Sequence, residues 1–189
     1  MKQTIMLLKI GEINQSILEK LKQSLELQFK EFKIAADHLY EVIPLEDKDY
    51  NFERKQFNAS KILEKIRNYM KGKQYFRVLG VIDKDIYSEN LNFVFGIANR
   101  FGKSALISIT RLRESFYSEL GKVYRKETQD IFEKRVLKEA IHELGHTFGL
   151  QHCNNHCIMR FSNSLMDTDN KPKAFCQVCI GRINKYLKK

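Results

Sequence analysis

The first third of the chain alternates between apolar runs and amphipathic stretches. A short apolar run from Thr4 to Ile10 ends at Gly11, which is typical of a buried strand. Apolar residues then recur at helical spacing and predict an amphipathic helix from about Asn14 to Phe29. A second strand is expected from about Phe32 to Val42. The chain therefore begins as strand, helix and strand.

A charged, irregular connection over residues 44–53 leads into further elements of the same kind. Asn58 or Ser60 can cap a helix whose apolar stripe ends before Gly72. Three strand-like runs follow, from Tyr75 to Ile82, from Asn92 to Ala98 and from Ser104 to Ile109. The last two could form a hairpin or neighbouring strands. The alternation predicts an α/β fold, in which helices pack against a sheet.

Another helix is predicted from about Asp130. On a helical wheel its apolar side chains gather within about 60° of Leu137. His142 and His146 fall at about 140° and 180° on the same wheel, opposite the apolar stripe. One face of this helix is expected to pack against the sheet, while the other is available for a metal ion.

The stretch from His142 to His152 has the spacing of a catalytic zinc site. His142 and His146 lie about 40° apart on a helix, so both imidazoles can reach one cation. Gly149 can adopt a positive φ, end the helix and let His152 approach from another side. Three imidazoles leave the fourth position of a tetrahedral zinc open for water, and Glu143 is placed to take the proton of that water. The alternative is a surface helix that carries two histidines by chance, and the added Gly149 and His152 argue against it.

Four cysteines near the end of the chain indicate a second metal site. They are Cys153, Cys157, Cys176 and Cys179. Four thiolates close a tetrahedron, so a zinc held by them would be structural. Disulfides or free core cysteines are the alternative, although such pairs are more often metal ligands in a reducing compartment. Because Cys153 follows His152 directly, this zinc would also anchor the segment that delivers the third histidine.

Other ligand-type residues are expected to have ordinary roles. His38 has no partner of that type nearby in the sequence, and four cysteines already complete a site without His156. Asp167 and Asp169 fall in a stretch rich in Ser, Asn and Thr, which predicts a loop.

Composition and charge narrow the class of protein. The 189 residues, 43% of them hydrophobic, suit one domain with a substantial core. No apolar run reaches the length of a membrane span, and the first nine residues are too short and too soon charged for a secretory signal. We therefore expect a cytoplasmic protein without a membrane partner. The formal charge of +10 is densest after residue 152, but a solvated basic face is favoured over a nucleic-acid surface.

The sequence resembles the archaemetzincins, a branch of the metzincin zinc metalloproteases. The resemblance rests on the stretch His142 to His152, on the four cysteines and on Met159. It extends upstream over residues 54–59, 79–83, 92–98 and 108–112. One departure is the spacing of the first two cysteines, which are separated by three residues here and by four in the family pattern.

The resemblance implies a metzincin-like mixed sheet packed with helices, and a role for each motif. His142, His146 and His152 would bind the catalytic zinc, Glu143 would be the general base, and Met159 would form the turn beneath the metal. The four cysteines would hold a second zinc, giving two per chain. Residues 1–189 would form one catalytic domain, in which residues 153–189 supply the Met-turn and the structural zinc part. Residues 93–109 would supply an edge strand that pairs with an extended peptide substrate.

Two functional hypotheses follow. In the first, the protein is a zinc metallopeptidase, in which a zinc-bound water activated by Glu143 attacks the scissile carbonyl. In the second, the same fold is a metal-stabilised, non-catalytic module that binds peptides or nucleic acid. The presence of Glu143 favours the enzyme, since a binding module does not need it.

Overall fold

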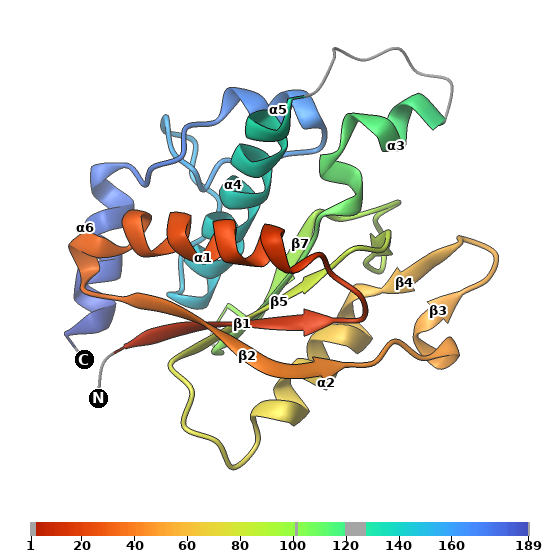
Figure 1. Ribbon diagram of the computed structural model, residues 1–189. Helices are drawn as coiled ribbons and strands as arrows, with labels where there is room; N and C mark the ends of the chain where they lie inside the picture. Colours follow the sequence, from red (N-terminus) through yellow and green to blue (C-terminus); the bar gives the residue numbers. More distant parts are fainter. Residues whose placement is uncertain (1–2, 101, 120–127, 189) are drawn as a thin grey trace.

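The main sheet of the protein lies between a group of helices on one face and α2 (Ala59–Met70) on the other (Figure 1). The computed structural model describes residues 3–100, 102–119 and 128–188. The strand order is β2-β1-β5-β8-β7, with four parallel strands and an antiparallel β7 at one edge. The strands are β1 (Thr4–Ile10), β2 (Ala35–Ile43), β5 (Arg77–Ile82), β7 (Gly96–Ala98) and β8 (Ser104–Ser108). This confirms the mixed sheet expected from the sequence.

Helices cover both faces of this sheet. α1 (Gln15–Gln28) and α4 (Gln129–Thr147) share one hydrophobic core with the first face, and α2 (Ala59–Met70) shares a second core with the other. Every residue of β5 is buried, as expected of a parallel strand covered on both sides. α4 packs against β7 and β8, which brings its histidines to the sheet edge.

Smaller elements surround these layers. A second sheet has the order β3-β4-β6. Its strands are β3 (Tyr50–Asn51), β4 (Gln56–Asn58) and β6 (Ile86–Tyr87). The remaining helices are α3 (Glu114–Glu119), α5 (Leu165–Asn170) and α6 (Gln177–Leu187), and 3-10 turns span Lys30–Phe32, Asp47–Asp49 and Thr110–Leu112. Among the described residues, no helix combines the length and apolarity needed to cross a bilayer.

The predicted helix starts are confirmed by their caps. The side chain of Asn14 accepts a hydrogen bond from the backbone N–H of Ser16 at 2.9 Å, and α1 begins at Gln15. The side chain of Asn58 likewise accepts from the N–H of Lys61 at 3.1 Å, at the start of α2. These contacts satisfy backbone donors that the first turn of a helix leaves free.

Two predicted strand boundaries and one predicted connection differ from the structure. β2 begins at Ala35 rather than Phe32, because a 3-10 turn and the left-handed Lys33, with a φ of 58°, come first. The strand expected over residues 92–98 is reduced to Gly96–Ala98, which does form the predicted hairpin with β8. The connection over residues 44–53 is not wholly irregular, since it holds a 3-10 turn and β3.

The loop predicted around Asp167 and Asp169 is a helix, α5. Ser164 caps it, because its hydroxyl oxygen accepts from the N–H of Asp167 at 3.2 Å and its hydroxyl donates to the Asp167 carboxylate at 2.8 Å. Polar residues that resemble a loop in composition here supply the start of a short helix.

Candidate active site and metal centres

Three histidines meet at the end of α4. His142 and His146 lie one turn apart on the helix. One ring nitrogen from each of these two residues and one from His152 all lie within 4.8 Å of one another. The Nε2 atoms of His142 and His146 are 3.1 Å apart. Two ligands of a tetrahedral zinc with bonds of about 2.05 Å would be about 3.3 Å apart, so the donor set fits zinc. Gly149 has a φ of 83° and ends the helix, as its position predicted.

The second nitrogen of two of these rings is held by the backbone. Nδ1 of His142 donates to the carbonyl of Ile158 at 3.0 Å, and Nδ1 of His146 donates to the carbonyl of Leu150 at 2.8 Å. A carbonyl only accepts, so Nδ1 carries the hydrogen in both rings. Nε2 is therefore left with its lone pair, in the arrangement usual for metal-binding histidines.

All three imidazoles favour the neutral form. Burial lowers the pKa of His142 well below its ordinary value, and the Lys171 ammonium and the other histidines lower it further. Burial is also the main cause of the lowered pKa values of His146 and His152. Neutral imidazole is the form that binds a metal, so the cluster is ready to do so near pH 7.

Glu143 lies beside this cluster and faces the same cavity. It is buried, and burial raises the pKa of its carboxyl group well above the ordinary value. The neighbouring Glu139 carboxylate raises it further, whereas Lys171 opposes the change. A carboxyl group with a raised pKa can both accept and return a proton near neutral pH.

A cavity of about 310 Å³ opens between α4, β7 and the chain after Met159. Residues 93–98 form one wall of this cavity. Of the stretch 93–109 expected to supply an edge strand, β7 lies at the edge of the sheet, whereas β8 lies between β5 and β7. A side chain at Gly96 would place its Cβ 2.6 Å from Cγ of Glu143, which means that the strand passes directly over this carboxylate. On the opposite wall, the ring of Phe161 lies 5.0 Å from that of His152.

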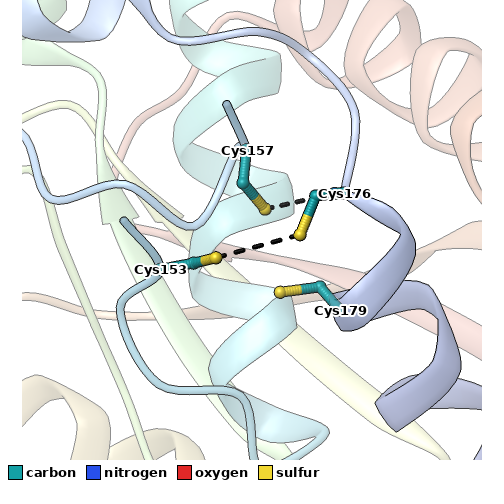
Figure 2. A group of neighbouring side chains, drawn as sticks. All are labelled: Cys153, Cys157, Cys176 and Cys179. Carbon is teal, nitrogen blue, oxygen red and sulfur yellow. Dashed lines mark hydrogen bonds between the residues drawn. The ribbon is translucent and has the colours of Figure 1, made fainter. Parts of the chain in front are cut away.

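The four cysteines form a second cluster. Figure 2 shows their side chains pointing toward one centre, two from the segment after α4 and two from the start of α6. All four sulfur atoms lie within 4.8 Å of one another, and none is in a disulfide. The sulfurs of Cys153 and Cys176 are 3.8 Å apart. Two thiolates on a tetrahedral zinc with bonds of about 2.3 Å would also be about 3.8 Å apart, so this cluster fits zinc as well.

Hydrogen bonds favour the thiolate at Cys176, whereas burial raises the pKa of the Cys157 and Cys179 thiols above the ordinary value. The sulfur of Cys157 accepts from the N–H of Cys176 at 3.3 Å and from that of Met159 at 3.5 Å. Burial opposes ionisation of Cys176, but hydrogen bonds from the backbone of Cys179 and the side chain of Asn155 lower its pKa to about 6. A thiolate is the form that ligates metal.

The two clusters are joined by the segment between Cys153 and Met159. The N–H of Cys153 donates to the carbonyl of Met159 at 2.9 Å, and the carbonyl that holds His142 belongs to Ile158. Met159 is fully buried, and its sulfur would lie 2.4 Å from a Cβ placed on Gly145 of α4. A side chain at this helical position would press on the buried methionine, so Gly145 permits the close contact between α4 and Met159.

The other ligand-type residues stay outside both clusters. His156 is exposed, and Nε2 of His38 lies 2.8 Å from a carboxylate oxygen of Glu19. Asp167 belongs to the cap of α5, and Asp169 forms two hydrogen bonds of 2.7 Å with Arg135.

Sequence reasoning missed a buried ion pair next to the site. An oxygen of Glu139 lies 2.8 Å from Nζ of Lys171, and both side chains are almost fully buried. Glu139 precedes Glu143 by one helical turn, on the side of the helix that carries His142. The sequence position of Glu139 could have revealed the pair. If the histidines line a cavity, a charged residue on the same side of the helix faces that cavity rather than bulk solvent.

Comparison with known proteins extends the similarity over nearly the whole chain. Residues 4–185 match the sequence model of peptidase family M54. The archaemetzincin of Methanocaldococcus jannaschii is 41% identical over 178 residues, which cover 92% of this chain and 89% of that protein. The crystal structure of archaemetzincin from Methanopyrus kandleri matches with a TM-score of 0.81 at 32% identity, covering 100% of this chain and 97% of that one. A zinc-dependent peptidase from Methanocorpusculum labreanum matches with a TM-score of 0.79 at 27% identity, over 95% of this chain and 100% of that one.

Proposed function

Since the chain belongs to peptidase family M54, the archaemetzincins, and is thus a zinc metallopeptidase, we propose how its residues divide the work of peptide-bond cleavage. Its substrates are peptides or proteins. Family membership favours this reading over the alternative of a non-catalytic binding module. The proposal concerns the role of each residue, the number of zinc ions and the placement of the substrate.

His142, His146 and His152 hold the catalytic zinc in this proposal. The spacing of their ligand nitrogens, their neutral imidazoles and the carbonyl acceptors at Nδ1 support the assignment. Zinc bound there would supply Lewis acidity, which would lower the pKa of a water and polarise the carbonyl of the substrate. The protein keeps the three rings in place and leaves the side toward the cavity open.

Glu143 is the proton carrier. It accepts a proton from the attacking water and returns it to the amine that leaves after the C–N bond breaks. Its place on the cavity wall beside the histidines and its raised pKa support this role. Because Gly96 brings β7 against the same carboxylate, the strand also limits the positions that the carboxylate can adopt.

The substrate lies along β7 as an additional strand. β7 is the last strand in the order of the main sheet, and residues 93–98 line the cavity. An extended peptide can pair with such an edge through its backbone, which leaves its side chains to fill the neighbouring pockets. The scissile bond is then held between the edge strand and the histidines.

A second zinc in the cysteine cluster is structural in this proposal. Four thiolates complete its coordination and leave no position for water or substrate. Met159, between the two clusters, forms the turn beneath the histidines and does not bind metal. We assign residues 1–189 to one catalytic domain, with residues 153–189 as its Met-turn and structural zinc part. The cytoplasmic location stays a prediction.

The proposal rests on one observation: the three histidines of the cluster and the carboxyl group of Glu143 face one cavity beside the edge strand β7. The test is cleavage of a diverse peptide library, read by mass spectrometry, with zinc-loaded wild type beside Glu143→Ala. We expect products from the wild type that are missing with the variant, at unchanged zinc content. Products that persist in Glu143→Ala would remove the proposed role of this residue.

A further inference from the structure

A buried ion pair forms part of the cavity wall beside the proposed catalytic residues. Glu139 lines the cavity but is only 3% exposed, and Lys171 behind it is also 3% exposed. The distance between Oε1 of Glu139 and Nζ of Lys171 is 2.8 Å. Desolvating two charges often offsets the attraction between them, so stability alone gives little reason for such a pair in this position.

The carboxylate of Glu139 is fixed from the side of α5. The hydroxyl of Thr168 donates to its Oε1 at 3.1 Å. Lys138 donates to the carbonyls of Thr168 and Asp169 at 2.9 and 2.7 Å, which ties α5 to α4. Lys171 directly follows α5. The carboxylate is therefore held by groups that lie behind the cavity wall, with the negative end of the pair toward the cavity.

The surroundings of the Glu139 carboxylate favour one class of substrate side chain. The cavity that Glu139 lines is largely apolar, and the rings of Phe93 and Phe95 are among its lining side chains. A substrate side chain with an apolar stem and a cationic tip can pack on these rings and donate to Glu139. An acidic tip would be desolvated against a carboxylate, which is unfavourable.

Arg100 also lines the cavity, at the end away from Glu139. Arg100 adjoins His146 and His152 in a second hollow that does not include Glu139. Glu139 and His146 are nearly two turns apart on α4. Glu139 is only four residues, or about 6 Å along the helix axis, from Glu143. A side chain that reaches Glu139 therefore belongs to a residue close to the bond that is cleaved.

We propose that Glu139 is a specificity-determining residue, which makes the cavity select a lysine or arginine side chain at one position flanking the scissile bond. Lys171 is a positioning residue that keeps the carboxylate in the wall. The inference rests on the proposed function, because it names the substrate class of the same site.

The experiment measures kcat/KM for peptides that carry Lys, Leu or Glu at each of the three positions on either side of the scissile bond. For the zinc-loaded wild type we expect one position at which Lys exceeds Leu by about tenfold, with Glu the poorest, as a charge-assisted hydrogen bond would give. In Glu139→Gln this ratio of Lys to Leu should fall by about tenfold. The ratio is the readout, because loss of the Glu139 charge also changes the environment of Glu143 and so acts on the turnover of every peptide.

Two further variants make the result specific. Glu139→Gln leaves the Lys171 ammonium buried without its ion pair, so the double variant Glu139→Gln/Lys171→Met, which removes both charges, is measured beside it. It should show the same loss of preference with a full zinc content. Glu133→Gln is the matched control, because Glu133 lies on α4 and pairs with Lys20 at 2.6 Å, away from the cavity. Its preference should equal that of the wild type.

Binding gives a readout that does not depend on turnover. The same peptides are titrated into Glu143→Ala and followed by fluorescence anisotropy, where Lys should again bind more tightly than Leu at one position. Lysine-selective binding without cleavage by the wild type would contradict the proposed function alone. Cleavage without a preference for Lys at any position, or a preference that both Glu139 variants retain, would overturn the inference. Neither cleavage nor selective binding would overturn both.

Discussion

The histidine and cysteine clusters share one stretch of chain, yet they differ in the number of ligands and in access. The histidine cluster offers three nitrogens, includes the exposed His152 and opens into a cavity of about 310 Å³. The cysteine cluster offers four sulfurs at the spacing of a closed tetrahedron, and two of its residues are buried. A zinc site with an open coordination position that substrate can reach can be catalytic. A site whose four ligands are all protein side chains can only stabilise the structure.

The clusters also differ in what holds their ligands. Two histidines come from consecutive turns of the buried helix α4, and backbone carbonyls orient them. The cysteines come from a loop and from the start of α6, so they have little regular structure to fix them without a metal. The carbonyl of Ile158, between Cys157 and Met159, connects the two arrangements through His142. The supporting site is therefore expected to influence the catalytic one.

Stepwise removal of zinc by a chelator should distinguish the two clusters most clearly. We expect a chelator to remove first the zinc of the histidine cluster, because it has three ligands and an exposed edge. Turnover should then stop while about one zinc per chain remains, and added zinc should restore it. Zinc content and turnover are measured on the same samples. Simultaneous loss of both ions, or turnover that survives loss of the first, would show that the difference between the clusters is wrongly assigned.

Breaking the cysteine cluster tests whether the clusters are coupled. Cys176→Ser should weaken zinc binding at the histidine cluster by about 10- to 100-fold, because it loosens the segment that carries the carbonyl partner of His142. Affinity is measured by competition with a zinc indicator. Val178→Ser is the matched control, since Val178 lies in the same turn of α6 and is 53% exposed. Unaltered affinity at the histidine cluster in Cys176→Ser would mean that the two sites are independent.

Substitutions in the packing between the two clusters should change the stability of the protein, which is a smaller effect than loss of zinc. A Cβ on Gly145 would lie 2.4 Å from the sulfur of Met159, whereas one on Gly181 of α6 would meet nothing within 4 Å. Gly145→Ala should destabilise the protein by about 1–3 kcal/mol through overpacking. Gly181→Ala should stabilise it by up to about 1 kcal/mol, because alanine is the better helix former. Denaturant unfolding of the zinc-loaded variants measures both, and equal effects would show that Gly145 has no special packing role.

The sequence predicted what depends on local periodicity and spacing. The starts of α1 and α2 follow from Asn14 and Asn58, and the convergence of each cluster follows from the spacing of its members. It did not predict what depends on residues that meet only in three dimensions. Glu139 and Lys171 are 32 positions apart and look like ordinary surface charges until α5 brings them together.

Two further features show the same limit. The polar residues at the start of α5 predict a loop because they suit either structure, and the hydrogen bonds of Ser164 decide in favour of a helix. Gly96 looked like one more residue of a strand, and only the packing of β7 over Glu143 explains why a side chain does not fit there. Composition and periodicity carry no information about such contacts.

The central claim is that the histidine cluster carries out the reaction and the cysteine cluster supports it. Glu143→Gln tests it most directly, because the substitution keeps the shape of the side chain but removes its ability to carry the proton. Native mass spectrometry counts zinc ions per chain while peptide turnover is recorded on the same samples. We predict two zinc ions in both wild type and variant, with kcat lowered by about 10²- to 10⁴-fold in the variant. A variant with turnover close to that of the wild type, or a wild type that binds fewer than two zinc ions, would contradict the account.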